Sequence, residues 1–469
     1  MIRPTHIVVI GAGAAGLMAA RELGRAGKRV TLLEARDRCG GRINPLSPAQ
    51  FGYPAEGGAE FVHGEAPVTR SLLCEAGISL PPIEGTQRTA KDGKLSTDDS
   101  LETYEANLHT ALKELDDDLT VAEFLRRHFA GAEYDRLRRS VERMVEGYDA
   151  ADPERASMLA LRHEWMDEGR SSQVRVAGGY GRLIDFLVGR CRSHGVAIRL
   201  NAVVNAIAFA GSGALVRCAK GDAHECDAVV LTVPLPLLKD IVLPPTERER
   251  AAAAAADIGF GNVIKILMRF QTRWWLDERK HLANLTFLLS EARIPVWWTQ
   301  YPADFPVLTG WFGGPKTAGM AHLNEQELIE AGLTSLADVF GLAPEQLGRT
   351  LVAARAINWA YDPFARGAYS YATTETRAAQ SVLSNPHGGS VFFSGEALLP
   401  WERHGYGRGG AGERRGGCAH NPPLLAFSSA AVLSSFRFAR HDHQRVVWQR
   451  SAEDRYWRIL LQKSKIERS

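Results

Sequence analysis

The chain has 469 residues, 45% of them hydrophobic, and its 56 Lys and Arg against 54 Asp and Glu give a formal net charge of +2 at pH 7. This length exceeds what one hydrophobic core usually organises, so we expect two domains. The near-neutral balance argues against a nucleic-acid binder that works by bulk electrostatics. No apolar run reaches the ~20 residues that a membrane helix needs.

The cysteines are few and scattered, without the spacing of a metal site, so we expect no metal centre and a reducing compartment. They are Cys39, Cys74, Cys191, Cys218, Cys226 and Cys418. The N-terminus leads directly into an apolar strand pattern without a signal peptide. These features together predict a cytoplasmic protein.

The stretch from His6 to Glu34 has the pattern of a strand, a glycine-rich turn, a helix and a second strand. Three glycines follow the first strand in G-x-G-x-x-G spacing. Gly11 permits the tight turn, Gly13 lets the backbone approach a pyrophosphate, and Gly16 lets the helix pack close to the sheet. The helix begins at Ala14 and Ala15, and its positive N-terminus points at the phosphates.

The second strand ends on Glu34, near the spacing at which an acid accepts hydrogen bonds from a ribose diol. The whole βαβ unit, rather than the glycines alone, predicts dinucleotide binding. Gly40-Gly41-Arg42 then adds a second backbone approach and a guanidinium suited to phosphate. With Glu34-Ala35-Arg36, this region resembles the FAD-binding region of the flavin-containing amine oxidases, which include monoamine and polyamine oxidases.

Residues 57–64 alone indicate a glycine-flanked loop or short strand, in which a histidine can be purely structural. They resemble the family segment that passes the flavin ring and lines the substrate cavity. The resemblance implies that Gly58, Ala59 and Glu60 give backbone contacts to the cofactor. It also implies that His63 faces the substrate.

Residues 71–169 have a mostly helical and charged pattern, which we interpret as part of a substrate-side lid. A helix is expected over 182–194 and strands over 196–200, 203–209 and 228–234. The resemblance places these elements in the FAD domain. It implies that the backbone of Val204 meets the adenine, and that the strand carrying Thr232 and Pro234 closes the sheet beside the cofactor.

The strand expected over 263–270 carries a lysine. Alternation places Val263, Lys265, Leu267 and Arg269 on one face. From alternation alone, Lys265 is a solvent-facing charge. The order Gly, Lys, Phe over 261–270 resembles the segment with the family's active-site lysine, whose ammonium holds a water beside flavin N5. Tryptophans in the neighbouring strands are assigned to the core.

Residues 359–370 resemble the family segment that runs under the substrate, which implies that Trp359 lies near the flavin and Tyr369 forms a cavity wall. Covalently flavinylated members carry a cysteine soon after this tryptophan. No cysteine occurs between Cys226 and Cys418, so we expect non-covalent FAD. Residues 391–397 match the last FAD strand, with Gly395-Glu396 near the ribityl chain or pyrophosphate. The resemblance covers residues 5–397.

The family pattern fails after Ala397. The family continues with a Gly-Thr-Val-Glu-like turn into a helix that faces the flavin, whereas five glycines over 405–412 disfavour a helix here. Permitted codons for 404–413, read one base later, give Met-Gly-Thr-Val-Glu-Ala-Ala-Leu-Ala. We therefore predict that residues from about Pro400 onward come from a shifted frame, and that this form holds FAD weakly.

The sequence predicts an α/β protein with a Rossmann-like FAD-binding domain (1–75, 176–250, 385–440) and an interleaved α+β substrate domain (76–175, 251–384), with 400–469 as an aberrant tail. By resemblance, it oxidises a small-molecule amine, primary or secondary, mono- or polyamine, to an imine or aldehyde and reduces O₂ to H₂O₂. The alternatives are an L-amino-acid oxidase or desaturase of the same superfamily, and a flavin-binding protein with little turnover.

Overall fold

The computed structural model describes residues 5–64, 66–91, 93–97, 105–166, 173–276, 282–384 and 390–399. All of these residues belong to one compact unit within residues 1–432. The predictions for the tail, 400–469, lie outside the described residues. Within the described part, no helix is both long and apolar enough to cross a bilayer.

A five-stranded parallel sheet is assembled from the start, the middle and the end of the described chain. Its strands are β1 (His6–Ile10), β2 (Arg29–Leu33), β7 (Ala197–Arg199), β11 (Ala228–Leu231) and β19 (Val391–Phe393). The order is β19-β11-β1-β2-β7, and every neighbouring pair is parallel. The strands β1 and β2 with the intervening helix α1 (Ala14–Arg25) form the predicted βαβ unit.

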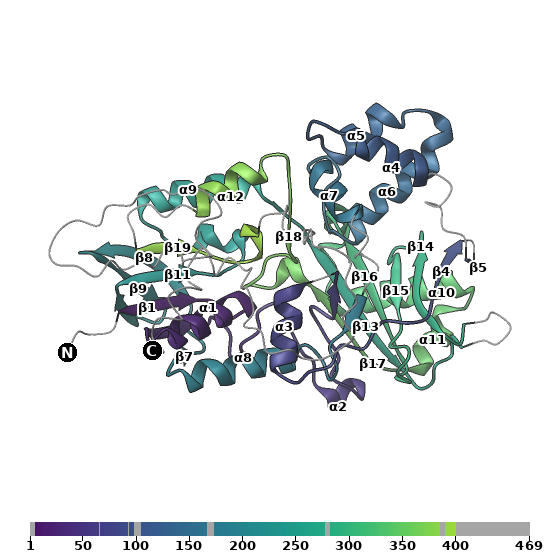
Figure 1. Ribbon diagram of the computed structural model, residues 1–469. Coiled ribbons are helices and arrows are strands. Elements are labelled where there is room, and N and C mark those ends of the chain that lie inside the picture. The colour runs from purple at the N-terminus through teal and green to yellow at the C-terminus, as the bar shows by residue number, and fades with distance from the viewer. Residues whose placement is uncertain are drawn as a thin grey trace, which may run out of the picture. The chain divides into compact units, whose positions relative to one another are not determined.

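Different elements cover the two faces of this sheet (Figure 1). Val8 and Ile10 point into a core shared with the meander β8 (Val204–Ala210), β9 (Gly213–Cys218) and β10 (Ala223–Cys226). The same core includes α9 (Pro245–Asp257) and α12 (Thr376–Ser384). Helix α1 packs against α8 (Gly181–Ser193), whose apolar side chains are buried. Both faces are buried, as a parallel sheet requires.

The second sheet has seven strands. They are β17 (Leu351–Asn358), β13 (Val263–Phe270), β16 (Val307–Gly313), β15 (Val296–Trp298), β14 (Leu285–Ser290), β4 (Thr86–Lys91) and β5 (Lys94–Ser96), in that order. All pairs are antiparallel except β14 with β4. The even-numbered residues of β13 pack under α10 (Glu325–Phe340). Alternation therefore assigns the two faces of β13 correctly, and Lys265 lies on the face opposite α10.

The helices α4 (Glu105–Lys113), α5 (Val121–His128), α6 (Asp135–Gly147) and α7 (Met158–Trp165) share an apolar core of their own. The prediction of a mostly helical 71–169 is right for these elements and wrong for 86–96, which form the β4–β5 hairpin. Ala90 is the one fully buried residue of β4, so this strand has almost no apolar periodicity to detect.

Short elements complete the description and position the site. They are α2 (Pro48–Phe51), β3 (Phe61–His63), α3 (Pro67–Glu75), β6 (Gln173–Arg175), β12 (Gly259–Phe260), α11 (Pro344–Thr350) and β18 (Ser370–Tyr371). Strand β3 pairs with β6, and β12 pairs with β18. The first pairing brings residues 173–175 next to residues 61–63.

Candidate active site

The turn between β1 and α1 is tightly packed except beside one glycine. Gly11 has a φ of +98°, and its N–H donates to the carbonyl of Leu33 at 2.8 Å. A Cβ on Gly16 would lie 1.8 Å from the Gly11 carbonyl oxygen, so only glycine lets α1 approach the strand this closely. A Cβ on Gly13 would meet nothing within 4 Å. The space beside Gly13 is therefore open.

This open space lies at the start of a helix. Gly13 is the N-cap of α1, and no side chain caps it. The N–H groups of Ala14, Ala15 and Gly16 belong to the first turn, where backbone donors have no helical acceptor. A Cβ on Gly395 would also meet nothing within 4 Å. Free donors at a positive helix end, with room beside them, suit a phosphate group.

Glu34 is 5% exposed at the end of β2. Its Oε2 accepts from the Ala12 N–H at 2.7 Å and its Oε1 from the Arg36 N–H at 2.9 Å. Because an ionised carboxylate offers about four acceptor positions, about two remain for a ligand hydroxyl. The Arg36 guanidinium binds both oxygens of Asp362 at 2.9 and 2.5 Å. Ala35, which lies between Glu34 and Arg36 in the sequence, is half-buried.

The second glycine turn approaches the first. Gly13 and Gly40 form an isolated bridge, and a Cβ on Gly41 would lie 3.4 Å from the Gly13 Cα. Arg42 follows, and its guanidinium binds both oxygens of Glu396 at 2.8 Å. Burial acts to raise the pKa of Glu396, but the Arg42 charge and its hydrogen bonds outweigh burial and lower that pKa. The two predicted cofactor residues are thus brought together as a pair.

Lys265 lies at the centre of a polar network in a fully buried position. Its side chain is 0% exposed, and its Nζ donates to the Gly58 carbonyl and to Glu60 Oε2, each at 3.0 Å. An ammonium has three donors; two bind these oxygens, and the Nζ also lies over the Trp298 ring, 5.3 Å from its centroid. No third nitrogen or oxygen acceptor for Lys265 is found among the described residues. Lys265 is therefore not the solvent-facing charge that alternation alone suggests.

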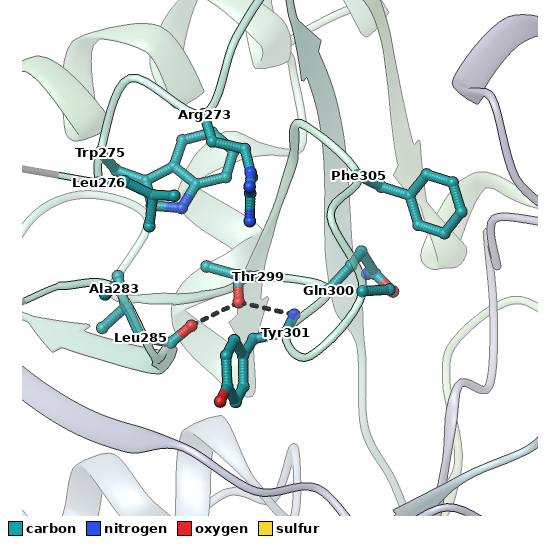
Figure 2. A pocket seen from close by; sticks show the side chains of 10 residues that line it. Arg273, Trp275, Leu276, Ala283, Leu285, Thr299, Gln300, Tyr301 and Phe305 are labelled. Atoms are coloured by element: carbon teal, nitrogen blue, oxygen red, sulfur yellow. Dashed lines mark hydrogen bonds between the residues drawn. The ribbon is translucent and has the colours of Figure 1, made fainter.

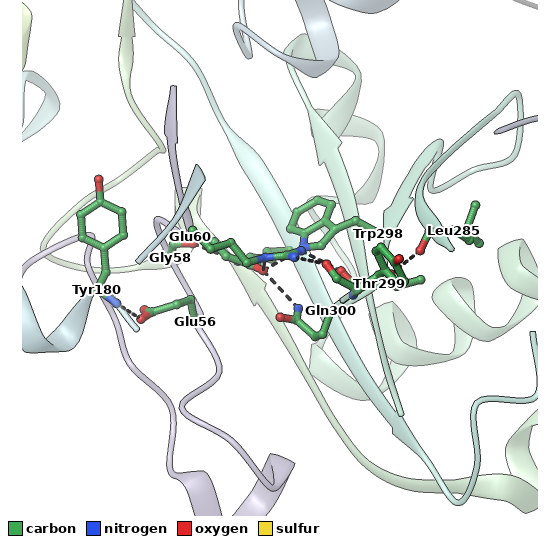
Figure 3. A network of polar contacts seen from close by, with 11 residues as sticks. Glu56, Gly58, Glu60, Tyr180, Leu285, Trp298, Thr299 and Gln300 are labelled. Atoms are coloured by element: carbon green, nitrogen blue, oxygen red, sulfur yellow. Dashed lines mark hydrogen bonds and ion pairs between the residues drawn. The ribbon is translucent and has the colours of Figure 1, made fainter. Parts of the chain in front are cut away.

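Glu60 is held on its other side by three further groups (Figure 3). Its Oε1 accepts from Trp298 Nε1 and Gln300 Nε2, each at 3.1 Å, and lies 3.4 Å from Arg175 Nε. Burial alone would raise the pKa of Glu60, but the Lys265 and Arg175 charges and the hydrogen bonds lower it. The Glu60 carboxylate is therefore ionised at neutral pH.

Glu56 is a second buried carboxyl near this network, and its environment shifts its pKa in the opposite direction to that of Glu60. It is 4% exposed; its Oε1 accepts from the Tyr180 N–H at 2.6 Å, at the start of α8, while its Oε2 has no partner among the described residues. Burial raises its pKa to about 7, and the Lys265 charge and the Tyr180 hydrogen bond only partly oppose this. Glu56 therefore titrates near neutral pH, far above an ordinary carboxyl.

Aromatic residues from three segments meet near His63. The His63 ring packs edge-on against Tyr148 at 5.2 Å between centroids, and the Tyr369 hydroxyl donates to the Tyr148 carbonyl at 2.5 Å. Surrounding protein lowers the pKa of His63 to about 4. The ring retains solvent contact, which limits this shift, and His63 is mainly neutral at pH 7 with or without it.

Trp359 is 4% exposed and lies against the glycines of residues 57–58. Its Nε1 donates to the Gly57 carbonyl at 3.3 Å, and a Cβ on Gly58 would lie 3.2 Å from its ring and 1.8 Å from the Arg42 carbonyl oxygen. The Ala59 N–H donates to the same Arg42 carbonyl at 3.3 Å. Trp359, Lys265 and Arg42 thus converge on this short segment.

The remaining predicted residues lie near the ends of strands in the five-stranded parallel sheet and in the meander β8–β10. Thr232 Oγ1 donates to the carbonyls of Ile10 and Gly11 at 2.8 and 3.0 Å, so it braces the first glycine turn. Pro234 begins the turn after β11, and buried Val204 begins β8. Whether these residues contact a cofactor stays a prediction.

A small pocket includes Gln300 in its lining (Figure 2). Its lining is mostly apolar and consists of Arg273, Trp275, Leu276, Ala283, Leu285, Thr299, Gln300, Tyr301, Ala303 and Phe305. Thr299 Oγ1 donates to the Leu285 carbonyl at 2.6 Å and accepts from the Tyr301 N–H at 3.1 Å. These bonds fix the end of β15, and so help to hold Gln300 toward Glu60.

Sequence reasoning missed the residues that hold Glu60, namely Arg175, Trp298 and Gln300. None lies in a recognisable motif, and Trp298 sits in an aromatic strand that is also typical of a core. Asp362 carries a weak signal, because it lies beside a proline in the segment assigned to the substrate side. The pairing of β6 with β3, more than 100 residues away in the chain, brings Arg175 to residue 60. The approach of β15 to residue 60 is likewise a tertiary contact, which no local pattern indicates.

Comparison with known proteins assigns the family. The model of the flavin-containing amine oxidoreductases matches residues 14–399. The chain belongs to this family. It is accordingly an amine oxidase by class, with the α/β fold and Rossmann-like domain that the sequence predicts, and the family implies a flavin cofactor.

Three relatives illustrate the match. Polyamine oxidase 4 of Oryza sativa subsp. japonica is 27% identical over 441 residues, which cover 84% of each chain. The human lysine-specific histone demethylase 2 is 26% identical over 423 residues, covering 83% of this chain but only 50% of that protein. A putrescine oxidase structure with bound putrescine superposes with a TM-score of 0.70 at 21% identity, covering 86% of this chain and 96% of that one.

Proposed function

We propose that this family member binds FAD non-covalently, oxidises a small amine at the carbon next to its nitrogen, and returns the electrons to O₂ as H₂O₂. The observation that carries the proposal is Lys265. A buried ammonium that donates to two protein oxygens, lies over the Trp298 ring and has no third oxygen or nitrogen acceptor among the described residues can donate its third hydrogen bond to one water molecule at a fixed place. Tyr148, Tyr369 and Trp359 lie around the same short segment, residues 57–64.

The residues around the two glycine turns fit FAD. The open space beside Gly13, at the uncapped start of α1, would take the pyrophosphate. The free acceptor positions of Glu34 would take the ribose hydroxyls. Gly395 also has room beside it, next to the Arg42–Glu396 pair. Bound FAD would supply the two-electron acceptor for the amine C–H bond.

The chain's own residues would orient the amine and keep its nitrogen neutral. A free alkylamine resembles a lysine side chain, with a pKa near ~10.4. An amine bound among the rings of Phe61, His63, Tyr148 and Tyr369 would lose part of its hydration on binding, and this loss would favour the uncharged form. Because His63 is mainly neutral at pH 7, it adds no positive charge beside the amine.

The amino-acid oxidase alternative is less well supported. A substrate carboxylate needs an available cation, usually an arginine. The guanidinium of Arg36 is bonded to Asp362, that of Arg42 to Glu396, and that of Arg175 to the carbonyls of Thr299 and Tyr301. These interactions favour a substrate without a carboxylate. Anaerobic flavin bleaching by a panel of amines and amino acids tests the choice, and no bleaching by any amine would favour a desaturase or a protein with little turnover.

Stopped-flow kinetics of Lys265→Met tests the role of Lys265. We expect reoxidation of reduced flavin by O₂ to slow by more than tenfold, with anaerobic reduction by amine changing less, because only the O₂ step relies on the held water. Lys316→Met is the matched control, since Lys316 is ion-paired to Glu146 at 2.7 Å but is largely exposed. Equal slowing of both steps, or of neither, would contradict the proposed role.

Non-covalent attachment is tested separately. Acid precipitation should release FAD into the supernatant, because no cysteine lies between Cys226 and Cys418. Flavin that stays with the precipitated protein would contradict this part of the proposal, and a released flavin with the mass of FMN would contradict the choice of FAD.

A further inference from the structure

The Glu60 side chain makes several contacts within the buried network, and these contacts are not needed for the backbone contact with a cofactor that the sequence predicts for this residue. Its Oε2 accepts from Lys265 Nζ, and its Oε1 accepts from Trp298 and Gln300 with Arg175 at 3.4 Å. The Glu60 side chain is 8% exposed and that of Lys265 is 0% exposed. Both members of this ion pair are therefore shielded from water. The position of charges matters most in such a buried environment.

The five side chains come from separate parts of the chain. Glu60 immediately precedes β3, Lys265 is in β13, Arg175 ends β6, and Trp298 and Gln300 lie at and just after the end of β15. Figure 3 shows the Glu60 carboxylate between Trp298 and Gln300. Groups from β6 and from the end of β15 thus hold one carboxylate, and that carboxylate holds the ammonium of β13.

We propose that the Glu60 side chain is a positioning residue that holds the Lys265 ammonium beside the Gly58 carbonyl. The inference rests on the proposed function of Lys265. A lysine has a four-carbon stem with many rotamers, so one carbonyl acceptor does not define where its charge lies. Glu60 supplies the second, charged contact point, and Trp298, Gln300 and Arg175 keep the carboxylate from turning away.

Other ionisable groups face this pair and enter any pH dependence. They are Arg175 from β6 and Glu56 and Tyr53 from the segment before β3. Of these, Glu56 titrates near neutrality. A pH profile of a Glu60 variant is therefore compared with that of the same variant carrying Glu56→Gln, so that the titration of Glu56 is not attributed to Glu60.

The test is a double-mutant cycle on the FAD-loaded enzyme with Glu60→Gln and Lys265→Met. We expect Glu60→Gln alone to slow reoxidation by O₂ about tenfold, within the coupling range of contacting residues, and to change amine reduction less than about twofold. In the Lys265→Met background, Glu60→Gln should have no further effect on reoxidation. Glu60→Asp, which keeps the charge, should be closer to the wild type than Glu60→Gln.

A spectroscopic readout accompanies the kinetics. The visible absorption of the bound oxidised flavin should shift in Glu60→Gln and in Lys265→Met, with no additional shift in the double variant. It should also show a different pH dependence in Glu60→Gln, because the loss of a neighbouring negative charge disfavours the ammonium. Glu247→Gln is the control for breaking a buried ion pair elsewhere, since Glu247 is 0% exposed and pairs with Arg250 at 2.7 Å.

Breaking one partner of a buried pair can prevent folding. The double variant removes both charges, so it keeps the cycle measurable against Lys265→Met even if Glu60→Gln is unstable. Equal slowing by Glu60→Gln in both backgrounds, or no slowing in the wild-type background, would overturn the positioning role. If Lys265→Met itself leaves reoxidation unchanged, the proposed function of Lys265 fails first, and the two failures are distinguished.

Discussion

Two buried carboxyls lie four residues apart, and their partners give them opposite properties. Glu60 is surrounded by Lys265, Arg175 and two neutral donors, and its pKa is lowered. Glu56 accepts hydrogen bonds from backbone N–H groups at the start of α8, has one oxygen without a partner in the described structure, and has its pKa raised to about 7. At the residue scale, the positive charges of Lys265 and Arg175 beside Glu60, rather than the degree of burial, decide which carboxyl is charged.

This contrast predicts how stability depends on pH. Because the pKa of Glu56 is higher in the folded state than its ordinary 4.5, the folded protein retains a proton that the unfolded chain releases. Glu56 therefore lowers the free energy of unfolding as pH rises from about 4.5 to 7, by up to about 3 kcal/mol. Glu56→Gln should be more stable than the wild type at pH 8 and similar at pH 4.5, as measured by urea unfolding. If the free energies of unfolding of the wild type and of Glu56→Gln differed by the same amount at every pH from 4.5 to 8, the raised pKa of Glu56 would be refuted.

Glu34 gives a second residue-scale prediction. Glu34→Ala should weaken FAD binding by roughly 1.5–3 kcal/mol, the scale of a hydrogen bond to a charged group. It also removes the acceptor for the Ala12 and Arg36 N–H groups, so Glu34→Gln, which keeps one acceptor oxygen, should be milder. Titration of the apoprotein with FAD, followed by flavin fluorescence, measures both variants. An unchanged affinity in Glu34→Ala would mean that Glu34 is not on the ribose.

A motif or a family order lets the sequence name candidate site residues, whose contacts with a cofactor stay predictions. Alternation separates the two faces of β13 but suggests a solvent-facing Lys265, so only the family order of Gly, Lys and Phe marks this lysine as a site residue. The partner of Arg42 is not marked in this way, because Glu396 is 354 residues away and any acid or phosphate suits a guanidinium. The same holds for Arg175 and Gln300, whose roles depend entirely on which strands pair.

At the scale of elements, the contact of α1 with β1 separates two glycines that look alike in the sequence. A Cβ on Gly16 would lie 1.8 Å from the Gly11 carbonyl oxygen and 2.7 Å from Thr232 Oγ1, whereas a Cβ on Gly13 would meet nothing within 4 Å. Both glycines belong to one motif, but only Gly16 is required for packing of the protein on itself. Gly13 faces open space, which leaves room for a ligand beside the backbone.

The two glycines therefore predict different losses. Gly16→Ala should destabilise the apoprotein by about 1–3 kcal/mol, the usual cost of overpacking. Gly13→Ala should leave apoprotein stability nearly unchanged, since its φ of −70° suits alanine, yet weaken FAD binding by at least tenfold. Thermal unfolding and FAD titration of the pair measure the two effects. A destabilised Gly13→Ala apoprotein that binds FAD normally would reverse this interpretation.

Element prediction succeeds where a pattern repeats and fails where an element lies at an edge. The helix α1 and the strands β1 and β2 occur within about a residue of their expected bounds. The hairpin β4–β5 was not expected, because polar residues dominate it and tertiary pairing with β14 decides its conformation. A hydrophobic pattern in the sequence indicates which residues are buried, so a strand with few buried residues, such as β4, cannot be predicted from it.

For the whole molecule, the prediction of a shifted reading frame concerns residues from about Pro400 onward. The family match ends at residue 399. A version with the frame restored should bind FAD stoichiometrically, whereas the present chain should bind it weakly. Resequencing the gene tests the premise, since codons that cannot yield the family motif in another frame would exclude it. Equal FAD binding by both versions would show that the family's helix is not needed for cofactor retention.

The order of strands in the parallel sheet also determines when the molecule can fold during synthesis. Strand β11 joins β1 near residue 231, but its other neighbour, β19, begins at Val391, about 160 residues later. At about 5–20 residues per second, a ribosome takes roughly 10–30 s to make that interval. During this time one edge of an apolar parallel sheet stays unpaired, which is a site for association between nascent chains. Yield in a producing cell should therefore respond to chaperone supply and to translation speed between residues 231 and 391 more than to speed before β11.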